Sequence, residues 1–380
     1  MKNFYPTQYK NDQEYFINHN YLKDQFKDYE AIMKEIQEVI LNTDFTLGRA
    51  VDEVEALIAN EANTKFAIAV GSGTDALFLS LKALGVGAGD EVITTTYTFY
   101  ATVGAIVTAG ATPVFCDVLD DYNIDPKEIE SKITSKTKAI IPVHWSGRPC
   151  MMKEIKEIAK NQNIYIIEDA CHAIQAEYEQ QKCGSLGTAG CFSFHPLKNL
   201  NVWGDGGIVT TNNEELSDKL RLIRNHGLIN RNTCMEFAYN SRLDTIQAVV
   251  AKYVIKNKLN NITSSRIKNS LLLDEHLSSV EHLSLNTRNV NLKEVFHLYM
   301  FKAKSRDQLA DFLKSNGVDA KIHYPIPMHL QPAAKYLNYK YGDFPKAEYL
   351  AENSISLPVH EYVNEVHIHR MIELIKDFYK

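Results

Sequence analysis

The stretch Gly190–Gly207, which reads GCFSFHPLKNLNVWGDGG, decides how the rest of the chain is interpreted. Its first part, Cys191–Phe194, is a short apolar run of strand-forming residues, and Pro196 ends that run. Lys198 then lies in a loop that closes on Gly204–Gly207, a cluster suited to tight turns. Because a single lysine is ordinarily a solvated surface residue, the meaning of Lys198 depends on the segments that lie beside it.

Two upstream segments predict strands that end close to this loop. Residues 164–169 are typical of a buried parallel strand ending in Asp169, and open α/β sheets bind ligands at the carboxyl ends of their strands. A helix N-cap is the alternative role for this aspartate. Residues 66–70 run into the turn Gly71–Asp75 and then into helical spacing, which predicts an anion site at a helix N-terminus. The lysine of a GxxxxGK[ST] loop is missing, which argues against a Walker-type nucleotide site.

An amine nucleophile, a buried carboxylate and a phosphate cradle on one sheet together match the needs of pyridoxal 5′-phosphate. That cofactor requires a lysine for its Schiff base, an acidic group that keeps the pyridine nitrogen protonated, and an anchor for its phosphate. Several runs also resemble signatures of the DegT/StrS family of sugar aminotransferases, in the family's order: GSGTDAL at 71–77, EDACHA at 168–173, and SFHPLKNL at 193–200 followed by GDGG at 204–207. The resemblance covers about residues 25–380.

Seven segments have the composition of strands, namely 65–70, 91–95, 112–117, 138–143, 164–169, 190–194 and 207–211. Helical patterns separate most of them, which predicts an α/β fold with a mainly parallel sheet covered by helices on both faces. The resemblance implies an aspartate-aminotransferase-type large domain of fold type I with a mostly parallel seven-stranded sheet, and a smaller C-terminal α/β domain.

We therefore expect an N-terminal arm at 1–25, a large cofactor-binding domain at 26–250 and a small domain at 251–380. A long lysine- and asparagine-rich helix is predicted at 254–273, near the boundary. The arm packs on the body or on a partner subunit, or else forms a loosely ordered tail; the sequence leaves these alternatives open.

The resemblance implies a role for each residue around the cofactor. Lys198 is expected to form the Schiff base and to shuttle the proton as general base and acid, while Asp169 keeps the ring nitrogen protonated. The other contacts implied are phosphate contacts from Gly73, Thr74 and Ser193, a contact with the ring face from Phe99, and a contact near the ring hydroxyl from His172.

A shared active site is implied by the segment Phe237–Arg242, which resembles the family's GYNxRxDxxQAA motif. In the family its Asn, here Asn240, reaches across a dimer interface to the cofactor phosphate of the neighbour, so a homodimer with shared active sites is expected. Judged by local sequence alone, Phe99 is a core aromatic residue, His172 is a satisfied buried histidine and Asn240 is a turn or cap residue.

Residues on the acceptor side come from two segments. Arg242 belongs to the motif just described, and His323, Tyr324 and His329 belong to a run that resembles the family's HYPxPxH signature. Two prolines make this run a rigid loop of the kind that presents side chains to a ligand, with structural histidines as the alternative.

The resemblance implies a transaminase that moves an amino group from an amino acid, L-glutamate, to a nucleotide-linked 4-keto or 3-keto deoxy sugar for surface-glycan biosynthesis. Histidine at position 172 favours C4 amination by analogy within the family. One alternative keeps the chemistry on a smaller acceptor, a keto-cyclitol or a phosphorylated ketone, whose pocket the unusual stretch His144–Arg148 would line. Another alternative is a catalytically silent relative with a regulatory or binding role.

Composition narrows the class of protein further. The 380 residues carry a net charge of −6 with a pI of about 6.1, which argues against nucleic acid or an anionic membrane as the main partner. The six cysteines have no CxxC or zinc spacing, so we expect reduced thiols and no metal site. Neither a signal-peptide h-region nor an apolar run of about 18 residues is found, so the expected location is the cytoplasm.

Overall fold

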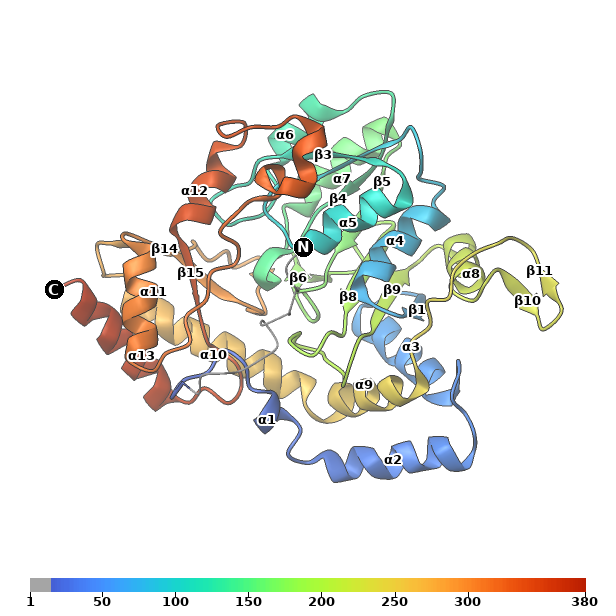
Figure 1. The fold of residues 1–380 in the computed structure, drawn as a ribbon, viewed down its shortest axis with the longest axis horizontal. Helices are drawn as coiled ribbons and strands as arrows, with labels where there is room; N and C mark the ends of the chain where they lie inside the picture. The colour runs from blue at the N-terminus through green and yellow to red at the C-terminus, as the bar shows by residue number, and fades with distance from the viewer. Residues whose placement is uncertain (1–14) are drawn as a thin grey trace, which may run out of the picture.

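The computed structural model describes residues 15–380, so most of the arm predicted at 1–25 lies outside the described residues. The centre of the fold is a seven-stranded sheet with the order β1-β9-β8-β5-β4-β2-β3 (Figure 1). Within this sheet β9 alone runs antiparallel to its neighbours, which confirms the predicted mostly parallel sheet. The strands are β1 (Phe66–Val70), β2 (Glu91–Thr95), β3 (Thr112–Cys116), β4 (Thr137–Ile141), β5 (Tyr165–Asp169), β8 (Ala189–Ser193) and β9 (Gly207–Thr211).

Helices cover both faces of this sheet, because its strands are apolar on both sides and must be buried on both. One face carries α3 (Arg49–Glu61), α6 (Pro126–Lys132), α7 (Met152–Gln162) and α9 (Thr245–Asn257), with α2 (Tyr29–Leu41) packed outside α9. The other face carries α4 (Gly73–Ala83), α5 (Tyr100–Ala109) and α8 (Glu214–Ile223). The alternation of strands and helices seen in the sequence therefore corresponds to a three-layer α/β unit.

A smaller α/β unit follows, as predicted. Its antiparallel sheet joins β12 (Leu283–Ser284), β14 (Tyr299–Ala303) and β15 (Ser354–Leu357), and its helices are α10 (Leu259–Leu277), α11 (Arg306–Ser315), α12 (Pro345–Asn353) and α13 (Glu365–Phe378). The helix predicted at 254–273 is wrong as a single element, because α9 ends at Asn257 and α10 begins at Leu259. Between them Lys258 leaves helical geometry, with φ −127°, and its ammonium bonds to Asp28 Oδ1 at 2.6 Å. The domain limits of 1–25, 26–250 and 251–380 stay a prediction.

The remaining elements are short. They are α1 (Leu22–Gln25), the 3₁₀ turns η2 (Trp145–Gly147), η3 (Met328–Leu330) and η4 (Pro332–Leu337), the sheet of β6 (Glu177–Tyr178), β7 (Gln181–Lys182) and β13 (Leu292–Lys293), and the hairpin of β10 (Leu228–Asn230) and β11 (Thr233–Cys234). The hairpin projects from the body beyond α8 (Figure 1). Among residues 15–380, no helix is both long enough and apolar enough to cross a membrane.

The sheet order brings three separate segments to one place. The end of β5 pairs in parallel with β8, so that Asp169 is opposite Cys191. The start of β9 pairs with the end of β1, with Gly207 opposite Val70, so the loop that carries Lys198 ends beside the turn that starts α4. The carboxylate, the lysine loop and the helix N-terminus are thus neighbours, although more than 120 residues separate Gly73 from Lys198 in the sequence.

Candidate active site

Asp169 and Lys198 form the centre of the candidate site. Asp169 is 6% exposed, and its carboxylate accepts a hydrogen bond from Thr102 Oγ1 at 2.8 Å and one from the Cys171 amide at 3.2 Å. Burial lowers the pKa of the Lys198 amine below its usual value, and the neighbouring Cys171 thiol and Asp169 carboxylate oppose this shift. A lysine with a lowered pKa beside a buried carboxylate is typical of nucleophilic and proton-transfer chemistry.

The turn before α4 forms a narrow cradle with the end of β8. Ser72 caps the helix by accepting from the Asp75 amide at 3.0 Å, and the amides of Gly73 and Thr74 have no partner within the helix, as at any helix N-terminus. A Cβ added to Gly73 would lie 2.6 Å from Ser193 Cβ and 3.0 Å from Cys171 Sγ, so only glycine leaves this space open. Thr74 is exposed at the same helix N-terminus. Gly73, Thr74 and Ser193 therefore lie together, in a place that suits a phosphate.

Aromatic rings form the walls of the site. Phe99 is 44% exposed at the start of α5, and its ring lies 5.9 Å from the ring of Tyr324. His172 is buried between Trp145, at 5.0 Å, and His297, at 4.2 Å, and its Nδ1 has no hydrogen-bond partner in the described part of the chain. Burial, together with the charges of Lys198 and His323, holds the pKa of His172 well below its usual value. The imidazole is thus neutral, and its buried Nδ1 is without a partner among the described residues.

The loop that contains His323 and Tyr324 closes the same site. Nδ1 of His323 lies 2.8 Å from Ser356 Oγ, and the carbonyl of His323 accepts from Tyr97 OH at 2.6 Å. Burial, with the charges of Lys321 and Lys198, lowers the pKa of His323 to about 4. The ring of Tyr324 packs against Phe99, Tyr100 and Trp145.

His329 differs from the other predicted acceptor residues. It is buried, and its Nδ1 lies 2.7 Å from Thr96 Oγ1 while its Nε2 lies 2.9 Å from Glu348 Oε1. Because both ring nitrogens are hydrogen-bonded inside the protein, His329 has no donor or acceptor left for an acceptor substrate. Its geometry agrees with the structural alternative and not with the predicted substrate contact.

Asn240 and Arg242 lie at the outer edge of the cradle. Between them, Ser241 accepts from the Gly71 amide at 3.0 Å and donates to Asp75 at 2.8 Å, which ties this segment to the turn before α4. Arg242 Nη1 donates to Asn225 Oδ1 at 3.0 Å. The side chain of Asn240 is exposed and has no hydrogen bond within residues 15–380.

Sequence reasoning missed three residues of this site. Thr102 holds Asp169 and follows the predicted ring contact Phe99 by three positions, so its place in the first turn of α5 was the available signal. His297 packs on His172 and places its Nδ1 3.3 Å from Asn199 Oδ1, next to Lys198 in the chain. No local pattern marks His297, because only the tertiary fold brings it there. Cys171 lies within the run EDACHA at 168–173, but the sequence assigned it no role.

A buried group of His144, Glu168 and Cys183 has atoms close enough to hold a metal ion. The carboxylate of Glu168 instead accepts from His144 Nε2 at 2.9 Å and from three backbone amides of the loop Gly184–Gly187. The Cys150 amide donates to His144 Nδ1 at 3.1 Å, and burial keeps the pKa of the Cys183 thiol well above its usual value. The group is therefore a satisfied hydrogen-bond network that supports the end of β5 and not a set of free metal ligands.

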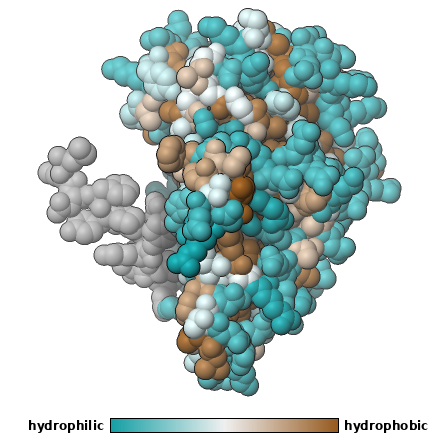
Figure 2. Space-filling view, turned by 90° about the vertical axis from the view of Figure 1, so that its right-hand side faces the viewer, coloured by the Kyte–Doolittle hydropathy of each residue, from teal (hydrophilic) through white to brown (hydrophobic). Residues whose placement is uncertain are grey.

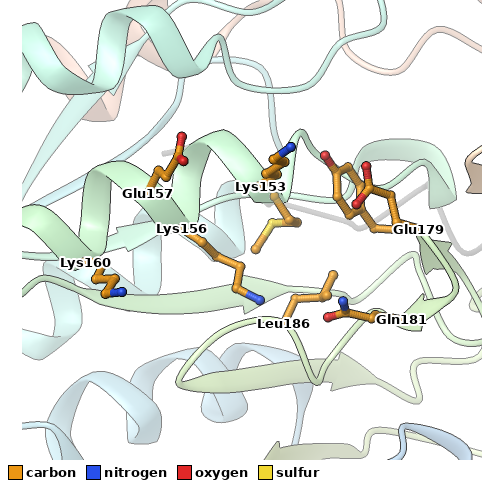
Figure 3. Close-up of a pocket in the computed structure, with 9 residues that line it drawn as sticks. Lys153, Lys156, Glu157, Lys160, Glu179, Gln181 and Leu186 are labelled. Atoms are coloured by element: carbon orange, nitrogen blue, oxygen red, sulfur yellow. The ribbon is translucent and has the colours of Figure 1, made fainter.

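A surface pocket lies between α7 and the β6–β7 hairpin (Figure 3). Its lining includes the exposed side chains of Lys153, Lys156 and Lys160 together with Glu157 and Glu179, and none of the predicted site residues lines it. Lysines and glutamates of mixed sign on one exposed helix face are typical of a solvated surface. The chemistry of this protein therefore lies at the carboxyl ends of the strands and not in this pocket.

These features define a class of enzyme. The fold is that of fold type I enzymes, and the buried carboxylate, the low-pKa lysine, the glycine cradle and the unpartnered imidazole fit the ring nitrogen, aldehyde carbon, phosphate and hydroxyl of pyridoxal 5′-phosphate. Residues 27–376 match the model of the DegT/DnrJ/EryC1/StrS aminotransferase family. The chain belongs to this family and is a pyridoxal-phosphate-dependent aminotransferase.

Two relatives and one solved structure illustrate the similarity. The chain is 42% identical over 355 residues to a pleiotropic regulatory protein of Geobacillus stearothermophilus, covering 92% of this chain and 94% of the relative. It is 38% identical over 348 residues to a UDP-N-acetyl-3-dehydro-alpha-D-glucosamine 3-aminotransferase of Acidithiobacillus ferrooxidans, covering 91% and 93%. The crystal structure of S. venezuelae DesV in complex with a ketimine intermediate superposes with a TM-score of 0.93 at 32% identity, covering 97% of this chain and 99% of that one.

Proposed function

We propose that this aminotransferase moves an amino group from L-glutamate to a keto sugar linked to a nucleotide, in the biosynthesis of a surface glycan. The observation that carries the proposal is the half-buried Lys198 near the buried Asp169 and the Gly73–Ser193 cradle, with Tyr324 of the 323–324 loop packed against Phe99. The relative named for amination of a UDP-linked keto sugar supports the choice of acceptor.

In this proposal the cofactor, when bound, supplies the electron sink that makes the Cα proton of the donor acidic. Lys198 would hold the cofactor through its Nζ and, as a neutral amine, would accept and return the Cα proton of the donor at the same atom. The carboxylate of Asp169 holds the proton on the ring nitrogen, and Thr102 fixes that carboxylate. Gly73, Thr74 and Ser193 hold the phosphate, while Phe99 and His172 hold the ring.

On the acceptor side, His323 and Tyr324 are proposed to contact the sugar, with Arg242 nearer the dimer interface. The sequence favoured amination at C4, from the histidine at 172. The relative from Acidithiobacillus ferrooxidans is named for amination at C3 of its sugar. The proposed acceptor is therefore a 3-keto sugar, with a 4-keto sugar as the second candidate. His329 is omitted, since both its ring nitrogens are engaged.

We further propose a homodimer in which Asn240 reaches the cofactor phosphate of the partner. The exposed Asn240 side chain supports this, as does apolar surface nearby: Ile229 is 59% exposed, Met235 63% and Phe237 fully exposed. Figure 2 views the side of the molecule that carries the β10–β11 hairpin, and it shows hydrophobic side chains at the surface among hydrophilic ones. A partner subunit placed there would cover them. A cytoplasmic location is also proposed, supported by six free cysteines.

The test is a pair of half-reactions on the purified protein loaded with pyridoxal phosphate. Glutamate should convert the visible absorbance band of the lysine-bound cofactor to that of its amino form, and a UDP- or dTDP-linked 3-keto sugar should restore the original band. If only a 4-keto sugar restores the original band, amination occurs at C4 and not at C3. Restoration only by a keto-cyclitol or a phosphorylated ketone supports the smaller acceptor. If glutamate causes no spectral change, another amino acid is the donor. If no band of bound cofactor forms even after incubation with pyridoxal phosphate, the regulatory role suggested by the name of the Geobacillus relative replaces this proposal.

A further inference from the structure

The segment 15–21, which precedes α1, is packed on the smaller C-terminal unit. For these residues the structure therefore favours an arm packed on the body over a loosely ordered tail. Ile17 is 2% exposed and forms a parallel bridge with Val318. The Asn18 carbonyl lies 2.8 Å from Nε2 of His360, and the ring of Tyr21 stacks on that imidazole with a centroid separation of 4.3 Å. Three consecutive attachments hold the residues between them in one place.

This segment carries His19 to the candidate acceptor wall. The ring centroid of His19 lies 5.5 Å from that of His323, whose own orientation is fixed by the bond to Ser356. The next residue, Tyr324, packs its ring against Phe99 and Trp145, so this loop lies against the candidate active site. His19 therefore lies directly beside His323, a residue of the candidate acceptor loop.

Basic groups surround the imidazole of His19. The charged or titratable side chains that act on it are His323, His360, Lys321 and Arg266, and they join burial in holding the pKa of His19 well below its usual value. The ring is therefore neutral at neutral pH. Its Nδ1 is buried and has no hydrogen-bond partner within residues 15–380.

One carboxylate is bonded to this cluster, that of Asp319. It accepts from the His19 amide at 3.3 Å and pairs with Lys321 at 2.7 Å, and neither contact involves the His19 imidazole. A buried ring nitrogen without a partner costs free energy that a ligand atom recovers on binding. His323 and His360 are neutral, so the cations that act on the ring are Lys321 and Arg266, with the buried carboxyl of Glu361 also acting on Arg266. The ligand atom that these two cations favour is a negatively charged oxygen.

We propose that His19 is an acceptor-binding residue whose imidazole donates a hydrogen bond to an anionic oxygen of the acceptor, beyond the keto ring. The oxygen belongs either to the diphosphate of the nucleotide or to a carboxylate on the sugar, which offer the same chemistry. This inference rests on the proposed function, because it requires an acceptor with a charged group outside the reacting ring. It gives the N-terminal segment a role in choosing the acceptor.

The experiment compares the wild type with His19→Ala in two separate half-reactions. The KM for a nucleotide-linked keto sugar should rise on the order of tenfold or more, as expected for the loss of a hydrogen bond to a charged group. The rate of the half-reaction with glutamate should stay unchanged. Phe16→Ala is the matched control, because Phe16 lies in the same segment, is 67% exposed and packs on His367. It should leave both half-reactions unchanged.

The outcomes separate the possible explanations. An unchanged KM in His19→Ala, or an equal rise in Phe16→Ala, overturns the inference. Equal slowing of the glutamate half-reaction also overturns it, by assigning the anion to the donor. A rise for neutral and acidic sugars alike identifies the diphosphate, and a rise for acidic sugars alone identifies the sugar carboxylate. If the wild type aminates no nucleotide-linked keto sugar, the proposed function itself fails.

Discussion

Replacing Gly73 by alanine tests the cofactor cradle most directly. The new Cβ would lie 2.6 Å from Ser193 Cβ and 3.0 Å from Cys171 Sγ, whereas carbon atoms in contact are ordinarily about 3.5–4.0 Å apart. To relieve these short contacts, the start of α4 and the end of β8 must separate by roughly 1 Å. Such overpacking costs about 1–3 kcal/mol, and the helix propensity of alanine offsets little of it because Gly73 is the first residue of α4. We therefore expect a loss of about 1–3 kcal/mol in the free energy of unfolding.

The larger effect of Gly73→Ala falls on cofactor affinity. The separation moves the N–H groups of α4 away from the Ser193 hydroxyl, so a phosphate can no longer bond to both. Loss of one hydrogen bond to a charged group, about 1.5–3 kcal/mol, raises the Kd for pyridoxal phosphate roughly 10- to 150-fold. The assay is a titration of the apoenzyme followed by visible absorbance, with Tm measured in parallel.

Gly104→Ala is the control for this experiment. Gly104 lies inside α5, and no atom lies within 4 Å of a Cβ added there. We expect an unchanged Kd and an equal or higher Tm, because alanine is the better helix former. The reasoning about the cradle is refuted if Gly73→Ala binds the cofactor with wild-type affinity, or if the two variants lose affinity equally.

Four further predictions follow from the same geometry. Lys198→Ala should abolish turnover, and a normal rate in this variant would contradict the assignment of the nucleophile. Mixing Lys198→Ala subunits with Asn240→Ala subunits should restore activity of up to one intact site per hybrid dimer, and no recovery would argue against shared sites. Thr102→Val should lower kcat/KM on the order of tenfold, because the carboxylate of Asp169 loses its 2.8 Å bond; unchanged kinetics would show that this bond is not needed. Burial lowers the pKa of His360 to about 3, from about 6.5 in an unfolded chain, so protonation favours unfolding. Stability should then fall as the pH drops from about 6.5 toward 3, by up to about 1.4 kcal/mol per pH unit, and His360→Asn should flatten a plot of Tm against pH.

Local sequence predicted much of the fold, because the elements of the sheet are strongly patterned. Each of the seven predicted strands lies within two residues of its observed bounds, since a buried parallel strand is apolar along its whole length. The single helix predicted at 254–273 failed because the break at Lys258 has no proline or glycine to mark it. That break depends on contacts with the distant residues Gln25 and Asp28, which a helical pattern does not encode.

The sequence by itself predicts the reacting groups of this enzyme, and the tertiary structure decides which side chains lie beside them. Lys198, Asp169 and the turn at Gly73 are each marked by a strand end or a glycine cluster, so their chemistry can be inferred from residues nearby in the chain. His19, Thr102 and the hydrogen-bonded state of both nitrogens of His329 are not marked in that way. The role of a histidine depends on what its ring nitrogens meet, and for His329 those atoms come from residues 19 and 233 positions away, which only folding brings together.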